Sequence, residues 1–263
     1  MPVVLGFAYC NVPVMPVRAD AFHTAEQTTQ LLFGEKAEIL ETNNRDWARI
    51  RCTWDDYEGW CKLSQLALIQ KKEHRKDARY FVAGHNGRVI MPKGEILLPM
   101  GSVLHNMKGG KLDLNGDTGK FKGKKGKQAN SELSEANIAE AALKYLHAPY
   151  QWGGRSVAGI DCSGFTQMVF KLCNFKLMRD ASQQATQGEV VDFLVNARCG
   201  DLAFFEERED QINHVGLLLN NETIIHATDA AGRVVIDRFD QGGIISTLLK
   251  KRTHKLRMVR RVF

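Results

Sequence analysis

One cysteine of this sequence stands where it could act as a nucleophile. Cys162 lies in the segment DCSGF, directly before apolar residues at helical spacing, so we predict that it opens a helix. The unpaired N–H groups and the dipole at a helix start lower the pKa of a cysteine there, and they can also stabilise an oxyanion. The alternative interpretation, taking Cys162 alone, is a buried structural thiol.

A thiol nucleophile needs a base, and two histidines lie on predicted strands after Cys162. His214 is in NHVGLLL, and His226, twelve residues later, is in TIIHAT. This spacing suits two adjacent antiparallel strands, on which His226 could orient the imidazole of His214. The three residues together predict a Cys-His-His triad. The other histidines are interpreted as ordinary core or surface residues: His23, His74, His85, His105, His147 and His254.

The elements that must position these residues follow from the pattern in the last half of the chain. The segment SELSEANIAEAALKYLHA predicts a helix that Ser131 or Ser134 caps and that ends before Pro149. In the turn YQWGG that follows, Trp152 is interpreted as a wedge and the two glycines as a tight turn. Four strand-like runs, DLAFF, HVGLLL, TIIHAT and RVVIDRF, complete a predicted α+β domain over residues 129–263.

The first half of the chain has short apolar or alternating runs broken by turn residues, which is typical of small β-barrels. In residues 1–70, the segments PVRA, QLLFGEKAEIL and WARIRCTWDDYEGWCKLSQL together resemble a bacterial SH3 domain. Residues 71–128 repeat the theme around RVIMPKGEILLPMGSVL, which predicts a second SH3-like barrel. The segment KKEHRKDAR would connect the two barrels, and a lysine-rich linker would follow the second.

Composition and charge argue against several other classes of protein. Charged residues make up 25% of the chain and hydrophobic residues 44%, as in soluble globular domains. Much of the formal charge of +6 sits in FKGKKGKQ and in a tail from Lys250 to Arg261. The lysines lack interleaved aromatic residues, so we expect a solvated linker and no nucleic-acid partner. No apolar stretch is long enough for a membrane span.

The six cysteines contain no CxxC pair, so neither a zinc site nor a disulfide scaffold is expected, and no metal or organic cofactor is predicted. Cys52 and Cys61 could face one another across a hairpin, where we expect them to stay reduced. The chain begins with Met1 and shows no signal peptide, so we expect a cytoplasmic protein. A trimmed targeting segment would instead indicate the periplasm or the cell surface.

Four motifs of the last half, YQWGGRSVAGIDCSGF, GDLAFF, NHVGLLL and IIHAT, resemble the NlpC-type, papain-like cell-wall peptidases. With the SH3-like front, the resemblance extends to the subgroup that hydrolyses the bond between gamma-D-glutamate and an L-diamino acid. It implies that Cys162 is the nucleophile, His214 the general base and His226 the orienting residue. It also implies that Tyr150, in YQWGG, assists the oxyanion site.

In the family subgroup that accepts peptides with a free N-terminal L-alanine, carboxylates and hydroxyls surround the amine. The residues that match this pattern are Asp161, Ser163, Ser182, Glu26 and Tyr57. A buried ammonium group needs compensating carboxylates, which fits Glu26 and Asp161. The alternatives are that Asp161 only caps the helix, that Ser182 only starts the next one and that Glu26 is a solvated surface charge.

The resemblance implies a cysteine endopeptidase acting on short murein peptides, of the form L-Ala-gamma-D-Glu-diamino acid, in cell-wall recycling. The diamino acid would be diaminopimelate or lysine. We expect a monomer whose SH3-like barrels restrict the cleft to short peptides. Two alternatives remain: an amidase or acyltransferase of the same fold on another acyl substrate, and a wall-peptide binding module. Alkylation of the thiol would separate them, because a binding module should tolerate it.

Overall fold

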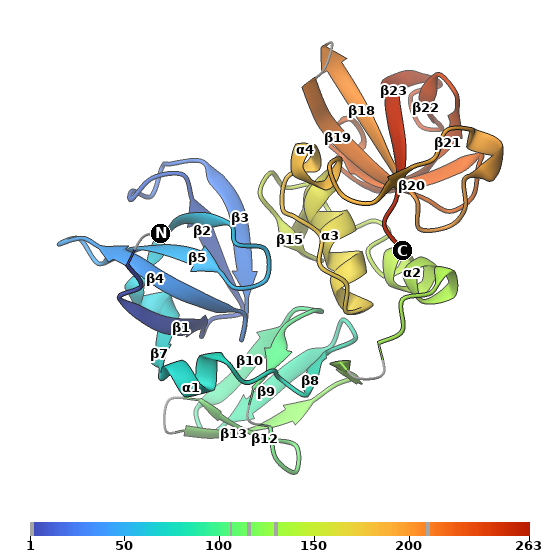
Figure 1. Cartoon of the computed structure of the whole chain (residues 1–263). Helices are drawn as coiled ribbons and strands as arrows, with labels where there is room; N and C mark the ends of the chain where they lie inside the picture. Colours follow the sequence, from blue (N-terminus) through green and yellow to red (C-terminus); the bar gives the residue numbers. More distant parts are fainter. Residues whose placement is uncertain (1–2, 106, 115–116, 129–130, 209–210) are drawn as a thin grey trace. The chain divides into compact units, whose positions relative to one another are not determined.

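The computed structural model describes residues 3–105, 107–114, 117–128, 131–208 and 211–263, which form two compact units (Figure 1). The first unit contains the residues up to Ser131 and the later segment Arg155–Val157. The second unit contains Glu132–Gly154 and Ala158–Phe263. Each unit is described by itself.

The chain before residue 70 forms one antiparallel sheet of seven strands, in the order β3-β2-β6-β5-β4-β1-β7. Its elements are β1 (Gly6–Cys10), β2 (Val14–Arg18), β3 (Gln27–Leu32), β4 (Lys36–Thr42), β5 (Trp47–Cys52), β6 (Glu58–Lys62), the 3-10 turn η1 (Leu63–Gln65) and β7 (Leu66–Ile69). Successive side chains of a strand point to opposite faces, so in β2 only Met15 and Val17 are buried.

The segment QLLFGEKAEIL contributes to two strands, β3 and β4, which are joined by a tight turn at Gly34. Gly34 has a φ of 78°, a left-handed conformation that suits glycine. A Cβ added there would collide with the backbone carbonyl of Val103. The turn therefore reverses the chain between β3 and β4 and depends on this glycine.

Cys52 and Cys61 lie on the neighbouring strands β5 and β6, but they are not opposite each other. Cys61 is opposite Ala48, and Cys52 is opposite Ala37 of β4. The prediction that they face one another across a hairpin is therefore wrong. Both are free thiols buried in the core of this sheet.

The rest of the first unit is built from a short helix and two smaller sheets, with strand orders β10-β9-β13-β12 and β11-β8-β14. The elements are α1 (Lys71–His74), β8 (Tyr80–Val82), β9 (Gly87–Met91), β10 (Gly94–Leu98), β11 (Val103–Leu104), β12 (Lys111–Leu114), β13 (Asp117–Lys122) and β14 (Lys125–Lys127). The segment RVIMPKGEILL forms a hairpin of β9 and β10, in which Met91 is opposite Gly94. The predicted lysine-rich linker is wrong, because all of its lysines except Lys124 lie in β13 and β14. They occupy exposed positions there, while Phe121 is buried.

The segment Arg155–Val157, which begins with β15 (Arg155–Ser156), belongs to the first unit although it comes later in the chain. The guanidinium of Arg155 donates to the carboxylate of Glu35 over 2.8 and 3.0 Å, and to the backbone carbonyl of Gln30 over 2.6 Å. Both charged side chains are almost fully buried. Buried charges are tolerated when they are paired and hydrogen bonded in this way.

The second unit begins with its helices, α2 (Glu135–Leu143), α3 (Cys162–Leu172) and α4 (Ala181–Gln184). The side chain of Ser134 accepts a backbone hydrogen bond from the first turn of α2, which confirms one of the two predicted caps. α3 begins at Cys162, as predicted, and packs against α2 and the strands β19 and β20 (Figure 1). Cys162, the candidate nucleophile, is thus the first residue of a helix whose residues are mostly buried.

The strands from β17 to β23 form a sheet in the order β17-β23-β18-β19-β20-β21-β22, and β22 also pairs with β23. The elements are β16 (Gly159–Ile160), β17 (Glu189–Val190), η3 (Leu194–Asn196), β18 (Leu202–Arg208), β19 (Gln211–Leu218), β20 (Thr223–Thr228), η4 (Asp229–Ala231), β21 (Arg233–Asp240), β22 (Gly243–Ser246) and β23 (Lys251–Arg261). The four predicted strand runs are confirmed as β18, β19, β20 and β21.

The basic segment near the C-terminus is not a tail. It forms the eleven-residue strand β23, which lies between β17 and β18. Its apolar residues Leu256 and Val259 join the core, whereas Lys255 and Arg257 are exposed and pair with Glu206 of β18. A strand can carry this many charged residues because every second side chain points to the solvent-exposed face of the sheet.

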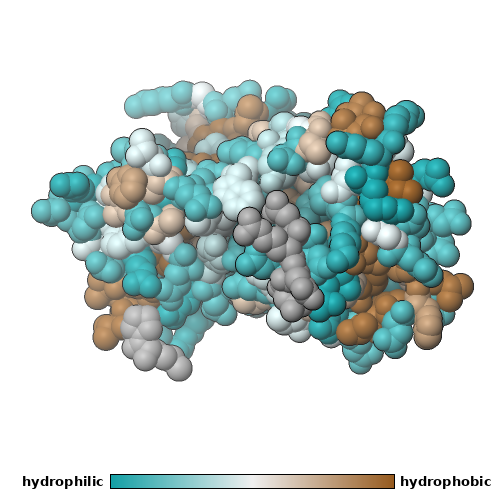
Figure 2. All heavy atoms as spheres, turned by 90° about the horizontal axis from the view of Figure 1, so that it is seen from above, coloured by the Kyte–Doolittle hydropathy of each residue, from teal (hydrophilic) through white to brown (hydrophobic). Residues whose placement is uncertain are grey.

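Figure 2 shows a face on which hydrophilic residues prevail and hydrophobic residues form separate patches. Exposed apolar side chains of the second unit include Val190, Phe193 and Val195. Scattered side chains of this kind are common on protein surfaces. Among the residues that the structure describes, none of the helices combines the length and the apolar character of a membrane span.

Candidate active site

The start of α3 places the thiol of Cys162 against strand β19. Its Sγ lies 4.0 Å from the carbonyl oxygen of Asn213. Asn213 is the extra residue of a β-bulge, because Phe205 of β18 is opposite His214 and Glu206 is opposite Ile212. Bulges redirect the side chains beside them, and this bulge lies next to His214.

Burial is the strongest influence on the thiol of Cys162. It raises the pKa of this thiol to about 12, and the carboxylate of Asp161 acts in the same direction. The backbone N–H groups of Val215 and Ser163 and the guanidinium of Arg179 lower the pKa, but by less. The prediction that the helix start gives Cys162 a lowered pKa is therefore wrong. At rest the sulfur carries its proton.

A line of hydrogen bonds runs from His214 through His226 to Asp237. Nε2 of His214 lies 2.9 Å from Nδ1 of His226, and Nε2 of His226 lies 3.2 Å from Oδ2 of Asp237. The other carboxylate oxygen accepts hydrogen bonds from the N–H of Thr247 at 2.7 Å and from its hydroxyl at 2.8 Å. Burial raises the pKa of Asp237, but the hydrogen bonds from His226 and Thr247 lower it on balance.

These contacts decide which nitrogen of each imidazole carries a proton. An ionised carboxylate only accepts, so His226 holds its proton on Nε2 and accepts at Nδ1. His214 must then donate from Nε2 to His226. The nitrogen of His214 left as an acceptor is Nδ1, and a general base for a thiol needs such an acceptor.

Strand register explains why these side chains meet. β19 and β20 are antiparallel with Leu217 opposite Ile225, and β20 and β21 are antiparallel with His226 opposite Val235. Asp237 is two residues from Val235 and therefore shares the face of His226. In the motif HVG, a Cβ on Gly216 would lie 3.0 Å from Cβ of His226, so this glycine gives the imidazole room.

His214 is 7% exposed, and its burial lowers its pKa well below the usual range. The neighbouring imidazoles of His254 and His226 act in the same direction. His214 is therefore neutral at neutral pH and able to accept a proton. Because Cys162 and His214 are both uncharged at rest, the proton would move from sulfur to nitrogen as the sulfur attacks.

A third histidine completes this cluster. The ring of His254, on β23, stacks on the ring of His214 with centroids 4.1 Å apart and planes 24° apart. Burial lowers the pKa of His254 to about 4. His254 is therefore a partly buried residue in contact with the ring of His214, within the range of the core or surface interpretation.

Tyr150 lies in the chain just before α3, and it is half-buried. Burial raises the pKa of its hydroxyl, and the nearby Cys162 and Asp161 act in the same direction. The phenol thus keeps its proton at neutral pH and remains a hydrogen-bond donor near the sulfur. Such a donor is suited to a developing oxyanion.

The turn after Tyr150 has the tight geometry predicted for its glycines. Gly153 has a φ of 70°, and a Cβ on Gly154 would lie 2.4 Å from the carbonyl oxygen of Gly159. Trp152 is 60% exposed, so its interpretation as a wedge is wrong. The turn depends on close backbone approach rather than on the indole.

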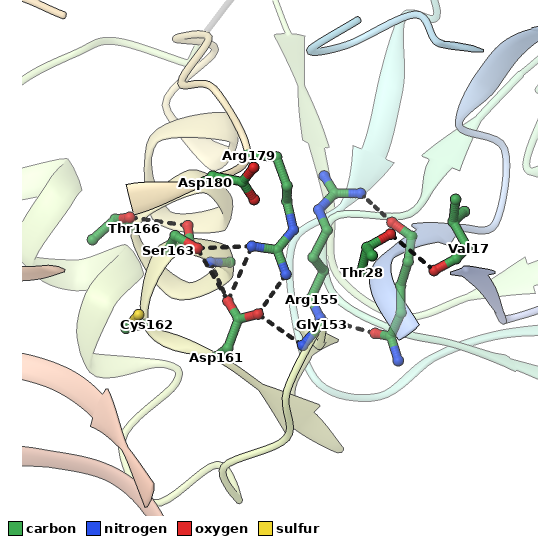
Figure 3. A network of polar contacts seen from close by, with 12 residues as sticks. Val17, Thr28, Gly153, Arg155, Asp161, Cys162, Ser163, Thr166, Arg179 and Asp180 are labelled. Carbon is green, nitrogen blue, oxygen red and sulfur yellow. Dashed lines mark hydrogen bonds and ion pairs between the residues drawn. The ribbon is translucent and has the colours of Figure 1, made fainter. Parts of the chain in front are cut away.

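Asp161 is held by a dense set of contacts (Figure 3). Oδ1 accepts from the N–H of Gly164 at 2.7 Å, which caps α3, and Oδ2 accepts from the N–H of Gly153 at 2.9 Å. The guanidinium of Arg179 donates to both oxygens, at 3.1 and 2.5 Å, and to the hydroxyl of Ser163 at 2.8 Å. These contacts favour the alternative in which Asp161 caps the helix over a role in binding an ammonium group.

The other predicted peptide-binding residues belong to other elements of the fold. Ser182 is exposed in the first turn of α4, where Asp180 is the N-cap residue. Glu26 is exposed just before β3, and Tyr57 packs on the core of the first sheet. Glu26 and Tyr57 belong to the first unit and Cys162 to the second, so their role in one site stays a prediction.

Three residues of the site are missed by the sequence analysis: Asp237, His254 and Arg179. Asp237 is a single charge inside the apolar run RVVIDRF, which is a usable signal because buried charges need partners. Arg179 directly precedes Asp180 and has no comparable periodic context. Among the described residues, no group of three or more His, Cys, Asp or Glu side chains could hold a metal ion.

Two segments of this chain, one in each unit, match known protein families. Residues 147–253 match the NlpC/P60 family, and residues 17–66 match the bacterial dipeptidyl-peptidase Sh3 domain. Dipeptidyl-peptidase 6 of Lysinibacillus sphaericus is 26% identical over 243 residues, which cover 82% of this chain and 86% of the relative. The SH3-like N-terminal part is therefore supported by sequence as well as by its strands.

Two further similarities concern the second unit and the fold. Gamma-D-glutamyl-L-lysine dipeptidyl-peptidase of Bacillus subtilis is 40% identical over 93 residues, which are 35% of this chain but only 31% of the relative. The crystal structure of an NlpC/P60 family protein from Bacillus cereus superposes with a TM-score of 0.80 at 17% identity. It covers 97% of this chain and 99% of that chain, so the fold is shared over nearly the whole length.

Proposed function

This chain belongs to the NlpC/P60 family of cell-wall peptidases, and from that premise we propose that it cleaves the gamma-D-glutamyl-L-diamino acid bond of murein peptides. The observation that carries the proposal is the line of hydrogen bonds from His214 through His226 to Asp237, with the thiol of Cys162 lying against Asn213, the residue before His214. The names of the relatives from Bacillus and Lysinibacillus support a dipeptidyl-peptidase. We propose short peptides with a free N-terminal L-alanine as substrates.

In the mechanism that we propose, Nδ1 of His214 takes the proton of the Cys162 thiol as Sγ attacks the gamma-carbonyl of D-glutamate. The backbone N–H groups at the start of α3 and the hydroxyl of Tyr150 stabilise the oxyanion. The imidazolium of His214 then protonates the departing amine, which leaves a thioester. Water, deprotonated by His214, hydrolyses the thioester and restores the thiol.

His226 and Asp237 stabilise the charge that His214 acquires. The proton taken from sulfur makes His214 a cation, and His226 accepts its Nε2–H at 2.9 Å. The ionised Asp237 lies directly behind His226. A fixed carboxylate in this position stabilises a transient imidazolium without taking its proton.

The proposal is tested with the tripeptide L-Ala-gamma-D-Glu-diaminopimelate, its lysine analogue and the N-acetylated forms of both. We expect release of the free diamino acid from the free-amine peptides, detected by mass spectrometry, and no release by the variant Cys162→Ala. Cys173→Ala is the matched control, because Cys173 is also buried but lies at the end of the same helix.

Equal cleavage of the acetylated peptides would retain the peptidase and reject the requirement for a free amine. Cleavage of neither form, with Cys162 still reactive towards iodoacetamide, would favour an amidase or acyltransferase on another acyl group. A chain that binds the peptides equally well before and after alkylation would be a binding module.

The titration of His214 gives a pH prediction for the same assay. His214 must be neutral to accept the thiol proton, and its pKa is lowered, so activity should persist as the pH falls below 6.5 and decline only at the lower folded pKa. We expect the acid limb of kcat/KM to lie below pH 6.5. An acid limb at or above pH 6.5 would contradict the buried environment described for His214.

A further inference from the structure

The ring of His214 is enclosed by three other rings. Its centroid lies 4.1 Å from that of His254, 5.1 Å from that of His226 and 5.7 Å from that of Phe205. His226 holds one nitrogen of His214 by a hydrogen bond, which still permits the ring to tilt about that contact. His254 is nearly parallel to His214, at 24°, and therefore covers its flat face.

The strand that carries His254 is shaped to present this ring. β22 and β23 pair with Ile244 opposite His254 and Ile245 opposite Arg252, so Thr253 is the extra residue of a bulge. The hydroxyl of Thr253 lies 2.9 Å from Nδ1 of His254 and fixes its orientation. A bulge re-aims the adjacent side chain, and here it lies beside His254 just as the Asn213 bulge lies beside His214.

Resting on the proposed function, we propose that His254 is a positioning residue: its ring stacks on His214 and holds that imidazole in the orientation that keeps Nε2 on His226 and leaves Nδ1 for Cys162. His254 does not touch the reacting atoms in this role. It limits the motion of the base, and small displacements of a catalytic group cost rate.

Several charged or titratable groups surround His254. His214 lies on β19, His226 on β20, Asp237 on β21 and Asp229 on η4. A neutral His254 stacks without repelling the imidazolium that forms on His214. It also keeps water from the ring of His214, because a stacked ring covers one face.

The test compares His254→Phe, which keeps a flat ring, with His254→Ala, which removes it. We expect His254→Ala to lower kcat on the tripeptide about tenfold or more with KM within about twofold of the wild type, and His254→Phe to recover most of kcat. Because His254→Ala admits water to His214, its acid limb should move up towards pH 6.5, whereas that of His254→Phe should stay low. His85→Ala, which changes an exposed histidine, is the matched control.

A second measurement separates this inference from the proposed function. The rate of Cys162 alkylation by iodoacetamide, followed against pH, reports on the thiol and its base even when no peptide is cleaved. A shifted alkylation profile in His254→Ala but not in His254→Phe supports positioning by the ring. Unchanged kcat and profile in His254→Ala, with thermal unfolding unaltered, would overturn it, as would a loss confined to KM in both variants.

Discussion

Replacing Asp237 by asparagine should lower kcat by about 10²- to 10⁴-fold while leaving the fold intact. The reason lies in Thr247, whose backbone N–H can only donate and already binds one oxygen of Asp237. An asparagine would keep its carbonyl oxygen on that N–H and turn its amide NH₂ towards His226. His226 would then accept at Nε2 and donate from Nδ1.

The exchange of donor and acceptor nitrogens in His226 would also change the protonation of His214. If Nδ1 of His226 donates, Nε2 of His214 must accept, and the proton of neutral His214 moves to Nδ1. The nitrogen intended for the thiol would then be occupied by a proton. The variant should therefore bind peptide normally and fail in the chemical step.

Asp240→Asn is the matched control for this prediction, because Asp240 lies at the end of the same strand but pairs with Arg252 at the surface. We expect its kcat to stay within about twofold of the wild type, since exposed ion pairs contribute little. Steady-state kinetics on the tripeptide give the rates, and nitrogen chemical shifts of the imidazoles give the tautomers. An Asp237→Asn enzyme of normal kcat, or one with unchanged tautomers, would show that Asp237 does not set the proton positions.

The triad was the most predictable part of the site, because each of its residues stands in a local context that the sequence displays. DCSGF before a helical pattern places Cys162, and strand runs separated by a short turn place His214 and His226 on neighbouring strands. The hydrogen bond of 2.9 Å between the two histidines follows from that register. The local sequence pattern was sufficient here, because the position of each residue depends only on its own helix or strand and on the next element in the chain.

His254 was not predictable for a physical reason. It reaches the site only because β23 returns to pair with both β18 and β22, and this pairing joins strands that are far apart in sequence. The lysines and arginines of β23 also obscure its alternating pattern in the sequence. Four of the six pair with acidic residues such as Glu206. A run of basic residues is therefore interpreted as a solvated tail unless its acidic partners are known.

The net pKa shift of Cys162, the proposed nucleophile, could not be predicted from the sequence either. The helix start and the N–H groups predicted a lowered pKa for Cys162, and they do act in that direction. Their effect is smaller than that of burial, which depends on how completely α3 is covered by α2 and the sheet. The sign of the net shift was therefore decided by tertiary packing.

A second large effect is expected at Arg179, whose guanidinium pairs with the buried carboxylate of Asp161, the residue before Cys162. Changing Arg179 to methionine should lower the local free energy of unfolding of α3 by about 3–5 kcal/mol, because it leaves Asp161 charged and buried without its cation. The two N–H donors from Gly153 and Gly164 remain, but they do not balance a full charge. The start of α3, with Cys162, should open first.

The measurement is native-state hydrogen exchange of peptides from α3, which reports the free energy of local opening in the intact chain. Arg198→Met is the control, since its pair with Glu135 is about half exposed and should contribute less than about 1 kcal/mol. The double variant Arg179→Met with Asp161→Asn removes the unpaired charge and keeps an oxygen to cap the helix. It should therefore recover most of the lost stability.

This third variant separates charge from packing. If the double variant is as unstable as Arg179→Met alone, the loss comes from the missing guanidinium contacts to Ser163 rather than from the uncompensated carboxylate. If Arg179→Met exchanges as slowly as Arg198→Met, the buried pair contributes no more than a surface pair. In that case the two backbone N–H donors to Asp161, rather than its cation, would stabilise the start of α3.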